Sequence, residues 1–157
     1  MRLTLGSHSY DLRTRALVMA VARSPMEGAD IVELAGPRPA ELPVCVMACD
    51  DDGVRRALSG GVDLLHLPKP TPSSLVMCAE AGAAVLIPFA ASADAANAGL
   101  PPERIVVDAL LVDVTAAHLP VVATAVGVIQ GARIVRTADV AAARRVCDVL
   151  AAVLEAP

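Results

Sequence analysis

The sequence contains almost no aromatic residues: Tyr10 and Phe89 are the only two, and tryptophan is absent. Aromatic rings are the platforms on which proteins stack the bases of single-stranded nucleic acids. The chain is also acidic, with a formal net charge of −4 at pH 7, whereas nucleic-acid-binding domains are usually basic. Together these two features argue against a nucleic acid as a partner.

Long hydrophobic runs are missing too, although 55% of the residues are apolar and the mean hydropathy is +0.59. A membrane-spanning helix needs roughly 18 or more consecutive apolar residues. Here the apolar runs are short, as in Ala16–Ala22 and Val44–Ala48, and glycine, proline or charged residues bound them. Such runs are typical of strands that are buried on both faces of a parallel sheet. We therefore expect no membrane partner.

Paired cysteine motifs and clear metal-binding motifs are also absent. The four cysteines are Cys45, Cys49, Cys78 and Cys147. No two of them form a C-x-x-C pair and no signal peptide is recognised, so we interpret them as small buried residues of a cytoplasmic protein, with Cys45 and Cys49 on one face of a strand. A zinc site would additionally need His66 or His118, and the spacing does not indicate one. The acidic run Asp50–Asp52 is more typical of a helix cap than of a metal site.

Short apolar runs alternate with helix-like segments along the chain, and a glycine precedes several of the runs, as at helix-to-strand junctions of parallel α/β units. We expect an N-terminal hairpin of Arg2–Leu5 and Ser9–Leu12, followed by eight strands. The expected strands are Leu17–Ala22, Asp30–Ala35, Pro43–Ala48, Asp63–His66, Ala84–Ile87, Arg104–Asp108, Leu119–Val122 and Arg133–Arg136. The expected helices are Asp51–Ser59, Pro72–Ala81, Ser92–Ala98, Thr124–Gln130 and Asp139–Leu154. This rhythm predicts an α/β fold, a reduced (β/α)8 TIM-barrel-like domain that covers residues 1–157.

Two of the expected connections are too short to contain a helix. Residues 23–28 join the first strand to the second, and residues 36–42 join the second to the third. A parallel crossover normally takes about a dozen residues, usually including a helix. We therefore expect helices to be missing after strands 1 and 2, which would leave the apolar outer faces of the first three strands uncovered. A second copy of the chain or another protein would then cover this flank.

The C-terminal segment combines a cation with the start of a helix. Arg136 stands at the end of the last expected strand, and Thr137 or Asp139 can cap the helix that follows. The first N–H groups of that helix and its dipole would face the same place as the guanidinium, which predicts a site for phosphate or another anion. The alternative is an ion pair between Arg136 and Asp113 or Asp139.

Several segments, in this order along the chain, resemble dihydropteroate synthases, which are pterin-binding TIM barrels. They are the hairpin with Arg15–Val21, then Glu27–Gly36, Gly61–Leu65, Leu100–Asp108 and Gly131–Val140. The resemblance covers nearly the whole chain and implies a barrel whose site lies at the strand ends. It also implies a place in folate biosynthesis. We expect no cofactor, and Mg²⁺ only if synthase activity is retained.

The loops that carry the family's chemistry are shortened or missing here. The Asn-x-Thr-Pro-Asp-Ser-Phe loop after the first strand is reduced to Arg23-Ser24-Pro25. The Ser-Thr-Arg-Pro loop after the second strand is reduced to Arg38-Pro39. The Gly-Phe-Gly-Lys run beyond the sixth strand and the Ser-Arg-Lys loop after the seventh are absent. These losses remove most of the groups that the resemblance implies for pyrophosphate, metal and aminobenzoate.

The strand ends differ from the family as well. Met47 begins the pair that replaces Asp-Thr on the third strand, and His66 begins the pair that replaces Asn-Asp on the fourth. Asp108 matches the family's pterin-binding Asp, and Arg136 matches the Arg of its Arg-x-His motif, whose His is replaced by Ala138. Two retained polar positions do not make a catalytic set.

We therefore expect a catalytically inactive relative of dihydropteroate synthase that is cytoplasmic and acts through association with itself or another protein. The alternative is a small pterin- or phosphate-binding enzyme of folate biosynthesis that uses Asp108 and Arg136. The candidate ligand-binding residues are Asp108, Arg136, Arg38, His66 and Arg23. No residue is assigned a catalytic or metal-binding role.

Overall fold

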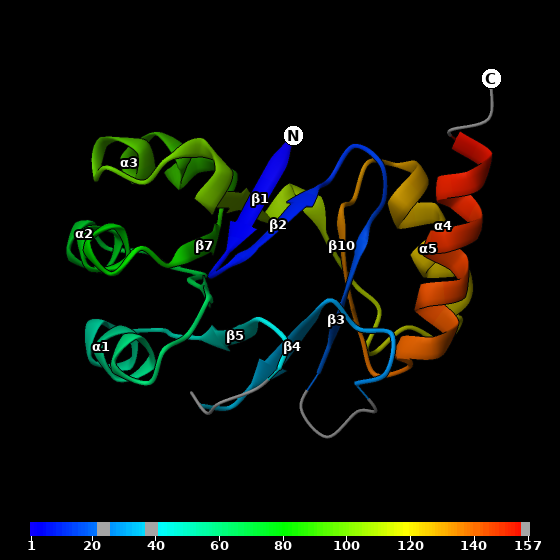
Figure 1. Cartoon of the computed structure of the whole chain (residues 1–157), viewed down its shortest axis with the longest axis horizontal. Helices are drawn as coiled ribbons and strands as arrows, with labels where there is room; N and C mark the ends of the chain where they lie inside the picture. The colour runs from blue at the N-terminus through cyan, green and yellow to red at the C-terminus, as the bar shows by residue number, and fades with distance from the viewer. Residues whose placement is uncertain (22–25, 37–40, 155–157) are drawn as a thin grey trace.

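The protein folds as a nearly closed barrel of eight parallel strands with an antiparallel hairpin at its N-terminus (Figure 1). The computed structural model describes residues 1–21, 26–36 and 41–154. Arg23 and Arg38, and with them the cores of both shortened loops, lie outside the described residues. The α/β barrel predicted from the sequence is confirmed.

Most barrel strands are shorter than predicted, Ala84–Ile87 has its predicted bounds, and all but one lie where we expected them. The hairpin consists of β1 (Arg2–Leu5) and β2 (His8–Asp11). The barrel strands are β3 (Leu17–Ala20), β4 (Ile31–Leu34), β5 (Val44–Met47), β6 (Leu64–His66), β7 (Ala84–Ile87), β8 (Ile105–Val107), β9 (Leu111–Asp113) and β10 (Ile134–Thr137). The helices are α1 (Asp51–Ser59), α2 (Pro72–Ala81), α3 (Ser92–Asn97), α4 (Pro120–Ile129) and α5 (Val140–Leu154). Three 3-10 turns are η1 (Phe89–Ala91), η2 (Pro102–Arg104) and η3 (Asp108–Leu110).

Hydrogen bonding joins the strands in the order β8-β7-β6-β5-β4-β3-β10-β9, all parallel. Glycines turn the chain from helix to strand: Gly82 ends α2 with φ +68°, and Gly131 precedes β10 with φ +110°. An L side chain rarely adopts such a positive φ, so glycine suits both junctions.

The hairpin closes the N-terminal end of the barrel. Leu3 and Leu5 of β1 are buried in one cluster with the interior side chains Leu17, Ile31 and Leu64. These three interior residues are the first residues of β3, β4 and β6, so β1 closes the N-terminal end of the barrel. The opposite, C-terminal end of the strands is left as the place for a ligand, as in other parallel barrels.

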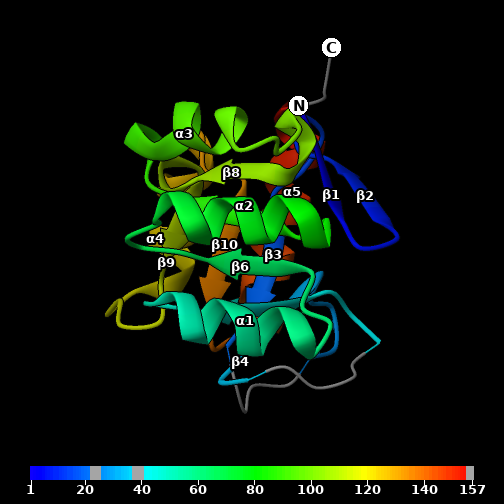
Figure 2. The same ribbon diagram turned by 90° about the vertical axis from the view of Figure 1, so that its left-hand side faces the viewer.

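Helices cover the barrel on two sides. The helices α1, α2 and α3 lie side by side over β5 to β8 (Figure 2), whereas α4 and α5 pack together against β3, β9 and β10 on the opposite side (Figure 1). Within the described residues, no helix is both long and apolar enough to cross a membrane.

The predicted loss of helices after the first two barrel strands is confirmed for the described parts of both connections, but the predicted exposed flank is wrong. Val18, Val32 and Val46, the outward residues at the centre of that flank, are all buried. Val18 is covered because α5 packs over β3, and Val32 and Val46 pack with residues of α1. With fewer helices around the barrel, each helix covers more than one strand.

The predicted strand Leu119–Val122 is also wrong. Pro120 begins α4, because a residue without an N–H fits the first turn of a helix, and Thr124 and Val128, four apart, face inward. The seventh barrel strand is β9, which follows β8 after η3 alone. A third helix is therefore missing, in the connection from β8 to β9, where only the three residues of η3 separate the two strands.

The cysteine prediction holds for three residues and fails for one. Cys45, Cys78 and Cys147 are buried, and none of the four cysteines is in a disulfide. Cys49 is exposed, because β5 ends at Met47 and the chain then turns into α1. Cys45 and Cys49 thus do not share a strand face.

Candidate functional site

A layer of polar side chains replaces the apolar interior at the C-terminal end of the barrel. Its members are Glu33 of β4, His66 of β6, Asp108 beyond β8, Asp113 of β9 and Arg136 of β10. Alternate residues of a strand face the same side. Glu33, His66 and Arg136 each follow, two positions later, a residue of the barrel interior. The charges of the other four residues act on His66, which indicates one cluster rather than scattered groups.

Arg136 is the centre of this polar layer. Its Nε donates to Glu33 Oε2 at 2.6 Å, its Nη2 donates to Glu33 Oε1 at 2.8 Å, and its Nη1 donates to Asp113 Oδ2 at 2.8 Å. The Arg136 and Glu33 side chains are only 21% and 14% exposed, whereas Asp113 is 46% exposed. The two-pronged contact with Glu33 is the strong geometry for a guanidinium and a carboxylate. These hydrogen bonds raise the pKa of Arg136 against the opposing effect of burial.

The predicted ion pair between Arg136 and Asp113 is therefore present, but the stronger partner is Glu33, which we did not predict. Because β3 lies between β4 and β10, the Arg136 side chain crosses the end of β3 to reach Glu33. A signal was available: Glu33 is the one charged residue of β4, a strand whose other residues are all buried and apolar. Asp139 instead accepts from the amide of Ala142 in α5, so its predicted cap is confirmed.

Asp113 is held by its own loop as well as by Arg136. Its Oδ1 accepts from the Thr115 amide at 3.0 Å and from the Thr115 hydroxyl at 2.7 Å. Partial burial acts to raise the pKa of Asp113, but these bonds and the Arg136 guanidinium outweigh it and lower the pKa. Asp113 is thus an anion at neutral pH, fixed in orientation.

His66 is held neutral by its surroundings. Burial lowers its pKa, against the opposite effect of the Glu33 carboxylate. Its Nδ1 is inaccessible to solvent and has no hydrogen-bond partner among the described residues. Burial and the charge of Glu33 also raise the pKa of the Cys45 thiol, so this cysteine is not a nucleophile at neutral pH.

Asp108, like Asp113, is an exposed carboxylate of the layer. Its Oδ1 accepts from the backbone amide of Phe89 at 3.2 Å, which links the ends of β8 and β7. The described part of the layer thus holds three carboxylates, Glu33, Asp108 and Asp113, against one guanidinium, which pairs with Glu33 and Asp113, and the neutral His66 adds no charge. The mouth of the barrel is therefore acidic, and it favours hydrogen-bond donors or cationic groups over anions.

The structure thus brings Asp108, His66 and Arg136 of the predicted residues together. It does not test Arg23 and Arg38, which lie outside the described residues.

In the described part of the chain, no group of three or more His, Cys, Asp or Glu residues could hold a metal ion. The acidic run before α1 has other partners. Asp50 accepts from the Gly53 amide at 2.6 Å and so caps the helix as predicted. Asp51 accepts from the Thr71 hydroxyl and Asp52 pairs with Arg55.

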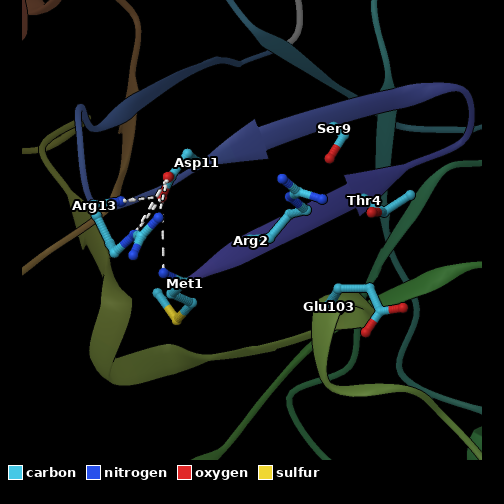
Figure 3. Close-up of a pocket in the computed structure, with 7 residues that line it drawn as sticks. All are labelled: Met1, Arg2, Thr4, Ser9, Asp11, Arg13 and Glu103. Atoms are coloured by element: carbon cyan, nitrogen blue, oxygen red, sulfur yellow. Dashed lines mark hydrogen bonds and ion pairs between the residues drawn. The ribbon is translucent and has the colours of Figure 1, made fainter.

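A hollow of about 570 Å³ lies beside the hairpin at the other end of the barrel (Figure 3). It is lined by Met1, Arg2, Thr4, Ser9, Asp11, Arg13 and Glu103. Asp11 pairs with Arg13 at 2.7 Å and lies 3.7 Å from the terminal amino group, and these side chains are largely exposed. Exposed pairs of this kind are weak, so we assign the candidate site to the C-terminal mouth.

The fold of this chain is that of dihydropteroate synthases. The Yersinia pestis enzyme aligns with a TM-score of 0.81 over 99% of each chain, at 15% identity. The Thermus thermophilus enzyme aligns with a TM-score of 0.79 over 97% of this chain and 99% of that chain, at 20% identity. The Mycobacterium tuberculosis protein Rv1207 aligns with a TM-score of 0.77 over 92% of this chain and 94% of that chain, at 19% identity. Neither a family model nor a curated protein sequence matches the chain.

Proposed function

We propose that this protein is a dihydropteroate-synthase-like barrel that does not form dihydropteroate and that acts through association with itself or with another protein. The observation that carries the proposal is the state of Arg136. Glu33 and Asp113 engage it through three short hydrogen bonds, so its charge is already balanced within the protein.

The synthase reaction needs the opposite arrangement. A pyrophosphate leaving group carries several negative charges, and its departure is promoted by cations that are not already neutralised. At this mouth the guanidinium is outnumbered by carboxylates, and Met47 presents an exposed apolar side chain at the end of β5. Among the described residues, the mouth supplies neither the charge nor the hydrogen-bonding groups for that step.

The direct test is an assay with pterin pyrophosphate, aminobenzoate and Mg²⁺. The purified protein should form no dihydropteroate above a blank that lacks protein. Turnover that is lost in the Asp108→Ala variant would contradict the proposal, because a contaminating synthase would not respond to this substitution.

A second candidate function is a small pterin- or phosphate-binding enzyme of folate biosynthesis. Asp108 favours it, since this exposed carboxylate is fixed by the Phe89 amide and lies in one cluster with His66, whose Nδ1 has no partner among the described residues. A pterin offers N–H donors to such a carboxylate. A phosphate at Arg136 would compete with two carboxylates and bind weakly. Arg23 and Arg38 belong to this proposal, and Mg²⁺ would be required only here.

We also propose a cytoplasmic location and a single domain over residues 1–157. Three buried thiols and no disulfide support the location, because reduced cysteines suit a reducing compartment. The eight strands that share one sheet support the single domain.

A further inference from the structure

Three arginines meet at the N-terminal end of the barrel, at the opposite end from the acidic mouth. Arg13 and Arg15 lie in the connection between β2 and β3, and Arg133 directly precedes β10. The strands β3 and β10 are neighbours, and the amide of Leu17 donates to the Arg133 carbonyl oxygen, so the two segments lie side by side. All three arginines line one cavity of about 60 Å³. We name it the arginine cavity.

Small side chains leave this cavity open. Cys147 and Ala151, one turn apart on α5, line it together with Ala16 and with Val128 of α4. A water molecule needs at least roughly 10–15 Å³, so the cavity has room for about four oxygen-sized groups, the number in a phosphate group. Its wall is apolar where the helices form it and cationic where the arginines do. Such low-dielectric walls strengthen the attraction between the guanidiniums and an anion.

Carboxylates do not fully balance the guanidiniums at this end of the barrel. Among the described residues Arg133 makes no ion pair, and its Nη1 donates only to backbone carbonyl oxygens. Arg15 Nη2 donates to Asp30 Oδ1 at 2.7 Å, but the buried Asp30 also pairs with Arg144. Arg144 has a second, longer contact of 3.5 Å with the exposed Asp148. The guanidiniums are therefore in excess here, which is the reverse of the mouth.

The cavity combines a fixed cation with a movable one. The Nη1 of Arg133 bonds the carbonyl oxygens of Val128 and Ala132, and within the described chain its Nε and Nη2 have no hydrogen-bond partner. The Nε and Nη2 of Arg13 donate to the Asp11 carboxylate, at a shortest distance of 2.7 Å (Figure 3), but the Arg13 side chain is 75% exposed. Such an exposed pair is weak, so Arg13 can turn toward an anion at little cost.

We propose that the arginine cavity binds a phosphate group, either of inorganic phosphate or of a small phosphate ester. Two oxygens of a phosphate match the fork of a guanidinium, and a phosphate ester has a charge of about −1.5 to −2 at pH 7. Arg133 would hold one pair of oxygens, while Arg13 and Arg15 approach from the other segment. The side chains of Arg13 and Arg15 are 75% and 45% exposed, so the organic part of an ester could lie in solvent. This site does not depend on the function proposed for the mouth.

An NMR titration of the full chain with inorganic phosphate tests the proposal. The amides of residues 13–17 and 133–134 should shift, with a lower dissociation constant than any shift of residues 137–140 at the mouth, and the constant should rise with salt. Arg133→Met removes the fixed guanidinium and should raise this constant at least about 10-fold. The exposed Arg56→Met is the matched control, because α1 lies on the other side of the barrel from α5 (Figure 1), and it should bind phosphate like the wild type. Shifts confined to residues 137–140, or wild-type affinity in Arg133→Met, would overturn the inference.

A cavity-filling variant covers the case in which Arg133→Met does not fold. Ala151→Leu places a larger side chain in the cavity, changes no charge and keeps a good helix former in α5. It should abolish the phosphate-dependent shifts of residues 13–17. Ala152→Leu changes the next, exposed position of the same helix and should bind phosphate as the wild type does. Normal binding by Ala151→Leu would refute the cavity as the site.

Glycerol phosphate, used as a second probe, identifies the source of the phosphate group. If it shifts the same amides with equal or higher affinity than inorganic phosphate, the ligand is a phosphate ester. If only inorganic phosphate shifts them, the ligand is the free ion. Failure of both probes to shift these amides would remove the proposal and leave the function proposed for the mouth unaffected.

Discussion

Replacing Arg136 with methionine removes the guanidinium that three hydrogen bonds tie to Glu33 and Asp113, while it keeps most of the aliphatic volume. Glu33 is 14% exposed, so the substitution leaves a largely buried carboxylate without its partner. Breaking a buried pair in this way costs about 3 to 5 kcal/mol. Asp113 is 46% exposed and adds little, because solvent screens it. We therefore expect the lower limit, a loss of about 3 kcal/mol in the free energy of unfolding.

Urea unfolding followed by far-UV circular dichroism measures this loss, since the chain has no tryptophan to report by fluorescence. With a slope of about 2 kcal/mol per molar, the midpoint of Arg136→Met should fall by about 1.5 M. Arg13→Met, which removes a solvent-exposed ion pair of similar length just after β2, should stay near the wild-type midpoint. Adding Glu33→Gln to Arg136→Met should recover part of the loss, because the stranded charge is then gone.

A midpoint for Arg136→Met as high as that of Arg13→Met would refute the reasoning. It would mean that the Arg136 pair behaves as a surface pair. The guanidinium would then be available to an anion, and the argument against pyrophosphate binding would fail.

Two further predictions concern His66 and Arg136. Burial lowers the pKa of His66 below its ordinary value of 6.5, so the unfolded chain takes up this proton at a higher pH than the folded protein. Stability should therefore be full above about pH 6.5 and fall as the pH drops toward the folded-state pKa. His66→Gln should flatten this fall in urea unfolding, and a fall of unchanged steepness in this variant would contradict the assignment. Phosphate should bind only weakly, in the millimolar to high micromolar range, and less as salt rises. In NMR titrations it should shift the amides of Thr137–Val140, and an Arg136→Ala variant with unchanged affinity would exclude the site.

The sequence was sufficient for most local features of the fold. The alternation of apolar runs with helical segments located seven of the eight barrel strands, and it located the hairpin. The helix caps at Asp50 and Asp139 were also predictable, because a cap depends on residues within one turn of each other. The seventh strand was missed because Val121 and Val122 have strand-like side chains, whereas in the structure both belong to α4 and are about half exposed.

The candidate site was predictable in its positions but not in its pairing. A strand-end Asp108 and a strand-end Arg136 could be recognised from the residues that precede them. Whether Arg136 is free or paired could not, because its main partner, Glu33, lies 103 residues away in the chain. The covering of β3 was undecided for the same reason, because α5 reaches it from a distant part of the sequence. The helix α1 follows β5 directly, but periodicity did not show that it also covers β4.

What the sequence by itself determined was therefore short-range: the strands, the helices, their caps and the parallel barrel that follows from their alternation. What only the tertiary structure decided was which surfaces remain exposed and which charges meet. Both depend on the curvature that brings β4, β9 and β10 to one mouth and on the way α4 and α5 pack over β3, β9 and β10. The spacing of apolar residues along a chain does not indicate which segments, far apart in the sequence, will contact each other.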